Sequence, residues 1–89
     1  LVGRIGGEEF AVVLVETNAE TGQPVIQRLL ERIRETAVIL ADGTPLQFTA
    51  SIGSTEILWG DTIDTAIRRA DEALYIAKND GRNRHCQRP

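Results

Sequence analysis

Runs of apolar residues predict a β-hairpin at the start of the chain. Residues 1–5 and 10–15 are apolar and rich in β-branched side chains, and the turn between them begins with Gly6 and Gly7, which tolerate positive φ. The second run is apolar at successive positions instead of alternating. Such a strand is typically covered on both faces, so we expect it to lie inside a sheet.

Two further stretches carry apolar residues at spacings of three and four, which is the pattern of an amphipathic helix. The first follows Pro24, a residue suited to a first helical turn, and continues for roughly four turns. The second runs from Ile63 to Ala77, with Asp61 as its expected N-cap and residues 79–81 (NDG) as its stop.

Strict alternation of apolar and polar residues predicts a strand over residues 46–52, ended by Gly53. The Asp-Gly pair at residues 42–43 marks a tight turn, which we expect to join this strand to a short one at residues 38–40. A last short strand is expected at residues 82–86. The order of elements is therefore strand, turn, strand, helix, strand, helix and short strand, which predicts an α/β fold with helices layered on a sheet.

Composition agrees with one ordinary globular domain. The chain has 89 residues, of which 42% are hydrophobic and 26% charged, and this excludes disordered and fibrous classes. The length allows one domain at most. Trp59 lies in a connection, where we expect it to pack over an edge of the core.

The cellular compartment is inferred from features that the sequence lacks. Its longest apolar runs have five residues, far fewer than the ~20 of a membrane helix. The single cysteine, Cys86, has no partner for an intrachain disulfide, and no signal peptide is recognisable, so we expect a cytoplasmic location. Because the chain begins at Leu1, inside an expected strand, we expect it to be an excerpt from a longer protein.

Charge is distributed unevenly along the chain. The formal net charge is −3, but residues 78–89 hold four basic side chains against Asp80 alone, so this tail carries +3 and the remainder −6. The acidic body argues against a nucleic-acid binder. The basic tail is suited to one phosphorylated ligand, and solvated surface charge is the alternative interpretation.

Glu8 and Glu9 follow the two glycines at the hairpin tip. Two carboxylates about 4 Å apart repel by roughly 1 kcal/mol in water, and a divalent cation removes this repulsion. Mg²⁺ takes carboxylate oxygens and completes its shell with substrate phosphates and water. Gly6 and Gly7 would let a ligand approach the backbone at the same place. The alternative is an acidic turn exposed to solvent.

Three motifs resemble the GGDEF family, the diguanylate cyclases. Residues 4–10 (RIGGEEF) resemble the family signature in its GGEEF spelling, and residues 49–53 (TASIG) resemble its T-x-S-I-G strand. Residues 70–83 (ADEALYIAKNDGRN) resemble the family's last helix and the turn after it. The resemblance implies that residues 1–89 are the C-terminal half of a GGDEF domain, with part of a nucleotidyl-cyclase, ferredoxin-like palm.

Members of this family condense two GTP molecules into cyclic di-GMP, with one GTP bound per subunit and two subunits facing each other. The resemblance implies that Glu8 and Glu9 are the acidic site residues, which act with Mg²⁺ or Mn²⁺ on the attacking ribose hydroxyl. It also places Gly6 and Gly7 in the substrate site. GTP and cyclic di-GMP are then the expected ligands, and a homodimer is the expected assembly.

Basic residues complete the implied site. Lys78 and Arg82 resemble the family's phosphate-binding pair, although an ordinary basic helix end is the alternative. Arg32 resembles a helix arginine that in some members helps to bind cyclic di-GMP as an inhibitor, and a solvated surface arginine is the alternative.

Other parts of the family's domain are expected upstream of this chain: a central strand with another metal-binding aspartate, the helices that recognise guanine, and the R-x-x-D inhibitory motif. We therefore expect these residues alone to be inactive. The parent is expected to carry neighbouring sensor or phosphodiesterase domains, which could attach it to a membrane. The alternatives are a degenerate GGDEF domain that binds GTP or cyclic di-GMP as a regulatory module, and a purely structural dimerisation unit.

The absent central strand leads to an expectation about topology. In the family fold it lies between the strands that we expect at residues 10–15 and 46–52. We therefore expect these two either to pair directly as a parallel βαβ unit or to receive pairing from a second copy.

Overall fold

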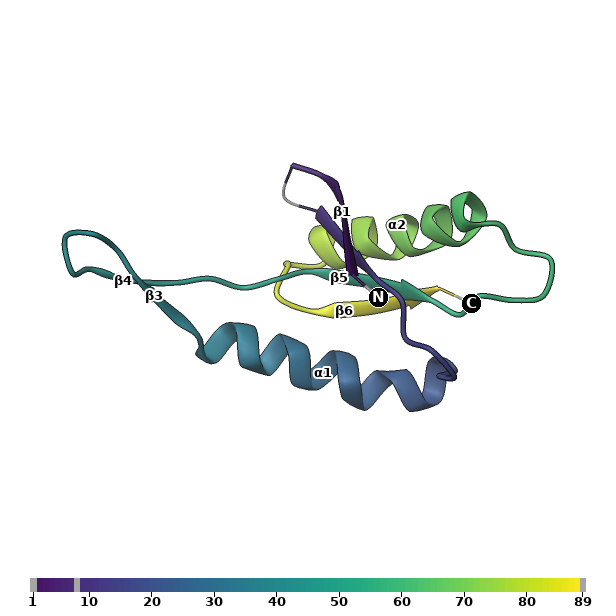
Figure 1. Cartoon of the computed structure of the whole chain (residues 1–89), viewed down its shortest axis with the longest axis horizontal. Coiled ribbons are helices and arrows are strands. Elements are labelled where there is room, and N and C mark those ends of the chain that lie inside the picture. Colours follow the sequence, from purple (N-terminus) through teal and green to yellow (C-terminus); the bar gives the residue numbers. More distant parts are fainter. Residues whose placement is uncertain (1, 8, 89) are drawn as a thin grey trace.

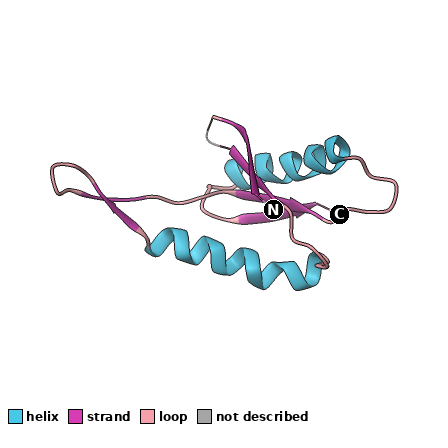
Figure 2. Cartoon of the chain, viewed as in Figure 1, coloured by secondary structure: helices cyan, strands magenta, loops and turns pink. Residues whose placement is uncertain are grey.

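A computed structural model describes residues 2–7 and 9–88 of the chain and confirms the mixed α/β class (Figures 1 and 2). Its elements are β1 (Val2–Gly6), β2 (Glu9–Val12), α1 (Ala19–Glu35), β3 (Ala37–Ile39), β4 (Pro45–Gln47), β5 (Ile52–Thr55), α2 (Ile63–Asn79) and β6 (His85–Arg88). Their order agrees with the predicted order except that the strand expected at residues 46–52 is divided, and it corresponds to part of a palm-like fold.

The strands form three separate pairs. β1 with β2 and β3 with β4 are antiparallel hairpins, whereas β5 and β6 are parallel and are connected through α2. The turn predicted at residues 42–43 is confirmed, because Gly43 has φ +86° and the Thr44 amide donates to Asp42 Oδ1 at 2.9 Å. This hairpin projects from the rest of the molecule, and with it the molecule measures 50 Å along its longest axis (Figure 1).

The best-packed region is the β5–α2–β6 unit. α1 and α2 lie on opposite sides of the β5–β6 pair (Figure 1). A Cβ built at Gly53 would overlap the backbone of Ala70 and Leu74, so only glycine lets α2 approach β5 this closely. Gly53 was expected to end its strand, but it lies inside β5. The buried apolar side chains of the described residues are few: Leu30, Ala66, Ala73 and Ala77.

The strand predicted over residues 46–52 is two strands. Pro45–Gln47 pairs with β3, whereas Ile52–Thr55 pairs with β6, and the residues between them belong to neither. The alternation continues across both strands although they have different partners. The last strand also begins later than predicted, at His85, because residues 81–83 adopt positive φ and reverse the chain first.

Both helix starts differ from the prediction. α1 begins at Ala19, a turn before Pro24, because Asn18 and Thr21 form a capping box; the proline therefore lies inside the helix. α2 is capped by Thr62, not by Asp61. The Asp61 carboxylate instead forms an ion pair with Arg69 at 2.6 Å, and hydrogen bonds from this guanidinium hold the pKa of Asp61 well below its usual range.

The prediction that β2 lies inside a sheet is wrong for this chain. In the described part, β2 pairs only with β1, and Phe10 and Val12 are 64% and 51% exposed. Within residues 2–7 and 9–88, β2 does not pair with β5, so only pairing with a second copy stays a prediction. The accessible surface is 6838 Å², against about 5200 Å² for a compact monomer of this mass. Much apolar surface is therefore uncovered.

Trp59 does not pack on the core. Its side chain is fully exposed in the connection between β5 and α2, contrary to the prediction. The neighbouring Ile57 and Leu58 are also exposed. Neither helix of the described residues is long and apolar enough to cross a membrane.

Candidate functional site

A hollow opens between the β1–β2 hairpin, α1, β5 and α2. Its volume is about 1710 Å³, larger than the roughly 300–1,000 Å³ of a typical small-molecule pocket. The predicted substrate-site and acidic residues that the structure describes all line it, namely Gly6, Gly7, Glu9, Lys78 and Arg82. The fold therefore brings the hairpin tip to the C-terminal end of α2.

The hairpin tip is shaped by a shift in strand register and by an arginine. The register of β1 and β2 shifts between Arg4 and Gly6, and the Arg4 guanidinium donates from Nε and Nη2 to the Gly7 carbonyl at 3.1 and 2.9 Å. Neither tip glycine has positive φ, so that part of the prediction is wrong. A Cβ at either would meet nothing within 4 Å, which leaves the tip open to a ligand. Glu8 lies outside the described residues.

Glu9 faces the end of α2. Its Oε1 lies 3.8 Å from Lys78 Nζ, and the two side chains are 45% and 41% exposed. Ion pairs with this exposure contribute little to stability, typically about 0–1 kcal/mol. The pair therefore orients the two side chains toward each other but holds them only weakly. A ligand can separate them at a small cost in free energy.

Lys78 and Arg82 lie on either side of the helix terminus. Lys78 is in the last turn of α2, and Arg82 follows Gly81 in the connection to β6. The Arg82 amide donates to the Ala77 carbonyl at 2.9 Å, which fixes its backbone against the helix end. Within the described part of the chain, its guanidinium makes no hydrogen bond or ion pair and is therefore available to a ligand.

A metal ion at the acidic tip would have to take most of its ligands from a bound nucleotide. Residues 2–7 and 9–88 contain no cluster of three or more potential metal-binding side chains. Mg²⁺ at nucleotide sites is commonly held by one or two carboxylates together with phosphate oxygens. Glu9 is a half-exposed carboxylate at an open tip, and Glu8 is its neighbour in sequence.

One of the seven predicted site residues lies away from the others. Arg32 is exposed on α1 and does not line the hollow, so the structure does not bring it to the other basic residues. Arg4 was not predicted, although it holds the tip through Gly7. Its position at the head of the RIGGEEF motif was the available signal.

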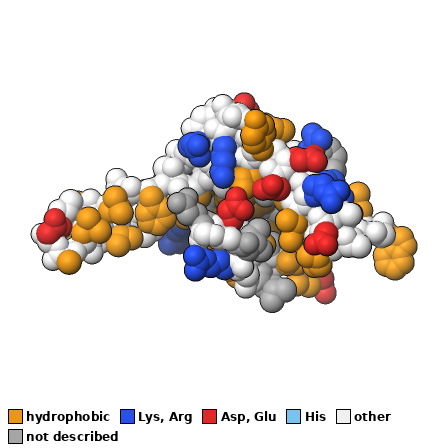
Figure 3. Space-filling view, turned by 90° about the horizontal axis from the view of Figure 1, so that it is seen from above, with side chains coloured by type: hydrophobic (Ala, Val, Ile, Leu, Met, Phe, Trp, Pro, Cys, Tyr) orange, Lys and Arg blue, Asp and Glu red, His pale blue; other side chains and the backbone are white. Residues whose placement is uncertain are grey.

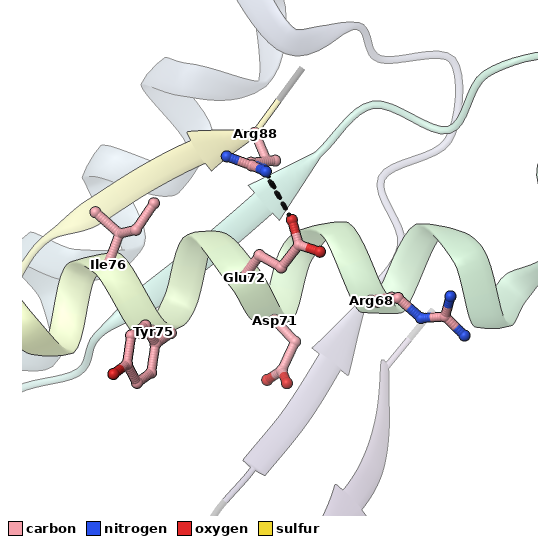
Figure 4. Close-up of a pocket in the computed structure, with 6 residues that line it drawn as sticks. All are labelled: Arg68, Asp71, Glu72, Tyr75, Ile76 and Arg88. Atoms are coloured by element: carbon pink, nitrogen blue, oxygen red, sulfur yellow. Dashed lines mark hydrogen bonds and ion pairs between the residues drawn. The ribbon is translucent and has the colours of Figure 1, made fainter.

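Charged side chains of both signs gather around the middle of one face of the molecule, with apolar ones between them (Figure 3). A second, shallower cavity of about 440 Å³ lies on the outer face of α2 beside the end of β6 (Figure 4). An ion pair of 2.9 Å between Arg88 and Glu72 crosses it. None of the predicted site residues that the structure describes lines this cavity.

Comparison with known proteins gives a consistent result. The family model described as "Diguanylate cyclase, GGDEF domain" matches residues 1–84. The chain is 39% identical over 84 residues to diguanylate cyclase DgcM of Escherichia coli K12, a match that covers 94% of this chain and 20% of DgcM. It is 42% identical over 88 residues to diguanylate cyclase DgcP of Pseudomonas aeruginosa, covering 93% of this chain and 12% of DgcP.

A solved structure shows the same arrangement of elements. Diguanylate cyclase SiaD from Pseudomonas aeruginosa, determined in complex with its activator SiaC, superposes with a TM-score of 0.91 at 39% identity. The match covers 98% of this chain and 33% of SiaD. The chain thus spans a fifth or less of the two curated relatives and a third of this structure.

Proposed function

Because this chain belongs to the GGDEF family of diguanylate cyclases, we propose that residues 1–89 form the C-terminal half of a GGDEF domain whose parent condenses two GTP molecules into cyclic di-GMP. One observation carries the proposal: the acidic hairpin tip and the basic end of α2 line the same hollow. A carboxylate and two cationic groups on one open surface are the groups that a metal-bound triphosphate requires.

Lys78 and Arg82 bind the triphosphate. Lysine offers a compact charge and arginine a planar fork, so together they neutralise one anion from two directions. The C-terminal end of α2 carries partial negative charge, which favours these two cations at rest. Glu9 holds Lys78 at 3.8 Å until phosphate replaces it.

Glu8 and Glu9 would hold Mg²⁺ or Mn²⁺ at the hairpin tip. When bound, the metal lowers the pKa of the attacking 3′-hydroxyl and screens the triphosphate. With a nucleotide bound, phosphate would take the place of Glu9 beside Lys78, and the Glu9 carboxylate would then be free to serve as a metal ligand. Gly6 and Gly7 leave room for the nucleotide, because open space surrounds the positions where their Cβ atoms would be.

The product requires two copies of the site. Each GTP supplies a 3′-hydroxyl that attacks the α-phosphate of the other, and each attack forms one phosphodiester bond and releases pyrophosphate. Each subunit holds one GTP, so we propose a homodimer in which two hollows face each other. GTP and cyclic di-GMP are then the ligands of the parent protein.

The test is cyclic di-GMP formation by the purified parent with GTP and Mg²⁺ or Mn²⁺. We expect Lys78→Ala and Arg82→Ala each to lower kcat/KM by about 10- to 100-fold, because a hydrogen bond to a charged group contributes roughly 1.5–3 kcal/mol. Arg28→Ala is the matched control, since Arg28 is exposed on α1 and lies outside the hollow.

The same assay separates the alternatives. Binding of GTP or cyclic di-GMP without turnover would replace the proposal with the regulatory module. Absence of both binding and turnover would leave only the structural role.

A further inference from the structure

The connection from α2 to β6 has an unusual backbone. Gly81, Arg82 and Asn83 have φ values of +121°, +63° and +49°. Positive φ is uncommon for a residue with a Cβ, because the Cβ approaches the backbone carbonyl. Arginine is not among the residues enriched in this conformation. Such residues persist where the surrounding structure holds them, and they cluster at functional sites.

The restraint comes from α1, a distant part of the chain. Arg34 lies in the last turn of α1, 49 residues before Asn83. Its Nε donates to Asn83 Oδ1 at 2.6 Å, and its Nη2 donates to the Asn83 carbonyl at 3.2 Å. Two nitrogens of one guanidinium therefore hold one residue, at its side chain and at its backbone.

Arg82 is fixed from three directions. Its amide donates to the Ala77 carbonyl at 2.9 Å, and its carbonyl accepts from Arg84 Nε at 3.0 Å. The next residue, Asn83, is held by Arg34. Arg82 lines the hollow, and no group of the described chain binds its guanidinium. The backbone is thus anchored while the charged end stays available.

We propose that Arg34 is a positioning residue for phosphate binding. It holds Asn83 so that Arg82 keeps its positive φ and presents its guanidinium in the hollow beside Lys78. This inference rests on the proposed function, in which Arg82 binds phosphate. The two Asn83 acceptors are reached from two different nitrogens of one planar guanidinium, a spacing that the single nitrogen of a lysine ammonium does not reproduce, so we expect lysine at position 34 not to replace arginine.

The test measures binding of 3′-deoxyGTP with Mg²⁺ to the parent protein. This nucleotide keeps the triphosphate but lacks the attacking hydroxyl, so turnover does not interfere. We expect Arg82→Ala to weaken binding by about 10- to 100-fold. Arg34→Ala should weaken it by about 3- to 10-fold, within the range for residues coupled through one network.

The decisive comparison is a double-mutant cycle. If Arg34 acts through Arg82, Arg34→Ala should change affinity by less than about 1.5-fold when Arg82 is already alanine. Thermal denaturation is measured for all variants. If Arg34 had a merely structural role, Arg34→Ala would lower Tm, and it would weaken affinity by the same factor in wild type and in Arg82→Ala. Arg34→Lys should behave like Arg34→Ala, and Arg28→Ala, on the same helix, should bind like wild type.

A second background tests the contact itself. Asn83→Gly keeps a residue that tolerates positive φ but removes the Oδ1 acceptor, so Arg34→Ala should have a smaller effect there than in wild type. The positioning role of Arg34 would be overturned if Arg34→Ala weakened nucleotide binding equally with and without Arg82. It would also be overturned if Arg34→Ala had no effect while Arg82→Ala weakened binding. Either result would leave the phosphate role of Arg82 standing. Unchanged binding by Arg82→Ala would overturn the phosphate role of Arg82, and this inference with it.

Discussion

The β5–α2–β6 unit and the β1–β2 hairpin carry the two halves of the proposed site, but they are packed very differently. α2 lies against β5 so closely that Gly53 cannot accept a Cβ, and this unit ends at Lys78 and Arg82. The hairpin exposes Phe10 and Val12, and within the described residues its one ion pair to the rest of the chain joins Glu9 to Lys78.

The difference shows which half of the site this chain organises. The basic end is preformed, because local packing and the hydrogen bonds around Arg82 fix it. The acidic tip lines the same hollow but has no apolar support on the face of Phe10. Phosphate binding and metal chemistry should therefore respond differently to mutation and to extension of the chain.

The largest expected effect concerns the acidic tip. In the parent protein, Glu8→Gln should lower cyclic di-GMP formation by more than about 100-fold, because a catalytic metal contributes several kcal/mol to transition-state stabilisation. The fold should stay intact. Glu20→Gln, which removes an exposed carboxylate from the first turn of α1, is the control. Cyclase activity retained by Glu8→Gln would remove Glu8 from the site.

The packing contrast is tested by placing valine at glycines in the two regions. Gly53→Val should destabilise the chain by about 3 kcal/mol, because its side chain would overlap the backbone of α2. Gly3→Val in β1 is the matched control, since a Cβ there meets nothing within 4 Å. Urea denaturation measures both. Equal effects at the two positions would contradict the contrast.

Truncation of large apolar side chains should show the same asymmetry with a smaller effect. Leu30→Ala should cost about 2–3 kcal/mol, because this side chain is only 1% exposed. Phe10→Ala should change the stability of the isolated chain by less than about 0.5 kcal/mol. In an upstream-extended chain the Phe10 substitution should become costly. If Phe10→Ala leaves the stability of the extended chain unchanged, no added segment covers β2.

The smallest effect is a dependence of stability on pH. Burial lowers the pKa of the His85 imidazole, whose Nε2 lies 2.5 Å from Ser54 Oγ. The unfolded chain, with an ordinary pKa near 6.5, therefore binds the proton more readily than the folded chain. Stability should be complete above pH 6.5 and fall below it. We expect a lower Tm at pH 5.5 than at pH 7.5, and His85→Gln should remove this difference.

The sequence predicts elements whose pattern and partner are local. The hairpin at residues 42–43 and helix α2 follow from a turn dipeptide and an apolar stripe, and both are present. Prediction from the sequence fails for strands whose pairing partners are distant along the chain. The alternation over residues 46–52 could not show that the chain changes from β3 to β6, and the apolar run of β2 predicts burial that the described chain does not provide.

The site divides in the same way. Glu9, Lys78 and Arg82 were identified from motifs, and the structure brings them to one hollow. The contact of Arg34 with Asn83 joins residues 49 positions apart, and on the helical pattern Arg34 is simply a polar residue away from the apolar stripe. Only the crossing of α1 over the β5–β6 pair brings its guanidinium to the end of α2.

The central claim is that these residues hold a preformed phosphate site and an acidic tip that other parts of the domain must complete. The most direct test compares cyclic di-GMP formation from GTP and Mn²⁺ by the isolated chain and by the same chain extended upstream through the central strand and the guanine-binding helices. Misplacement of reacting groups by about 1 Å already costs roughly 100-fold in rate. We predict product from the extended chain and none from the isolated one, whereas turnover by the isolated 89 residues would contradict the account.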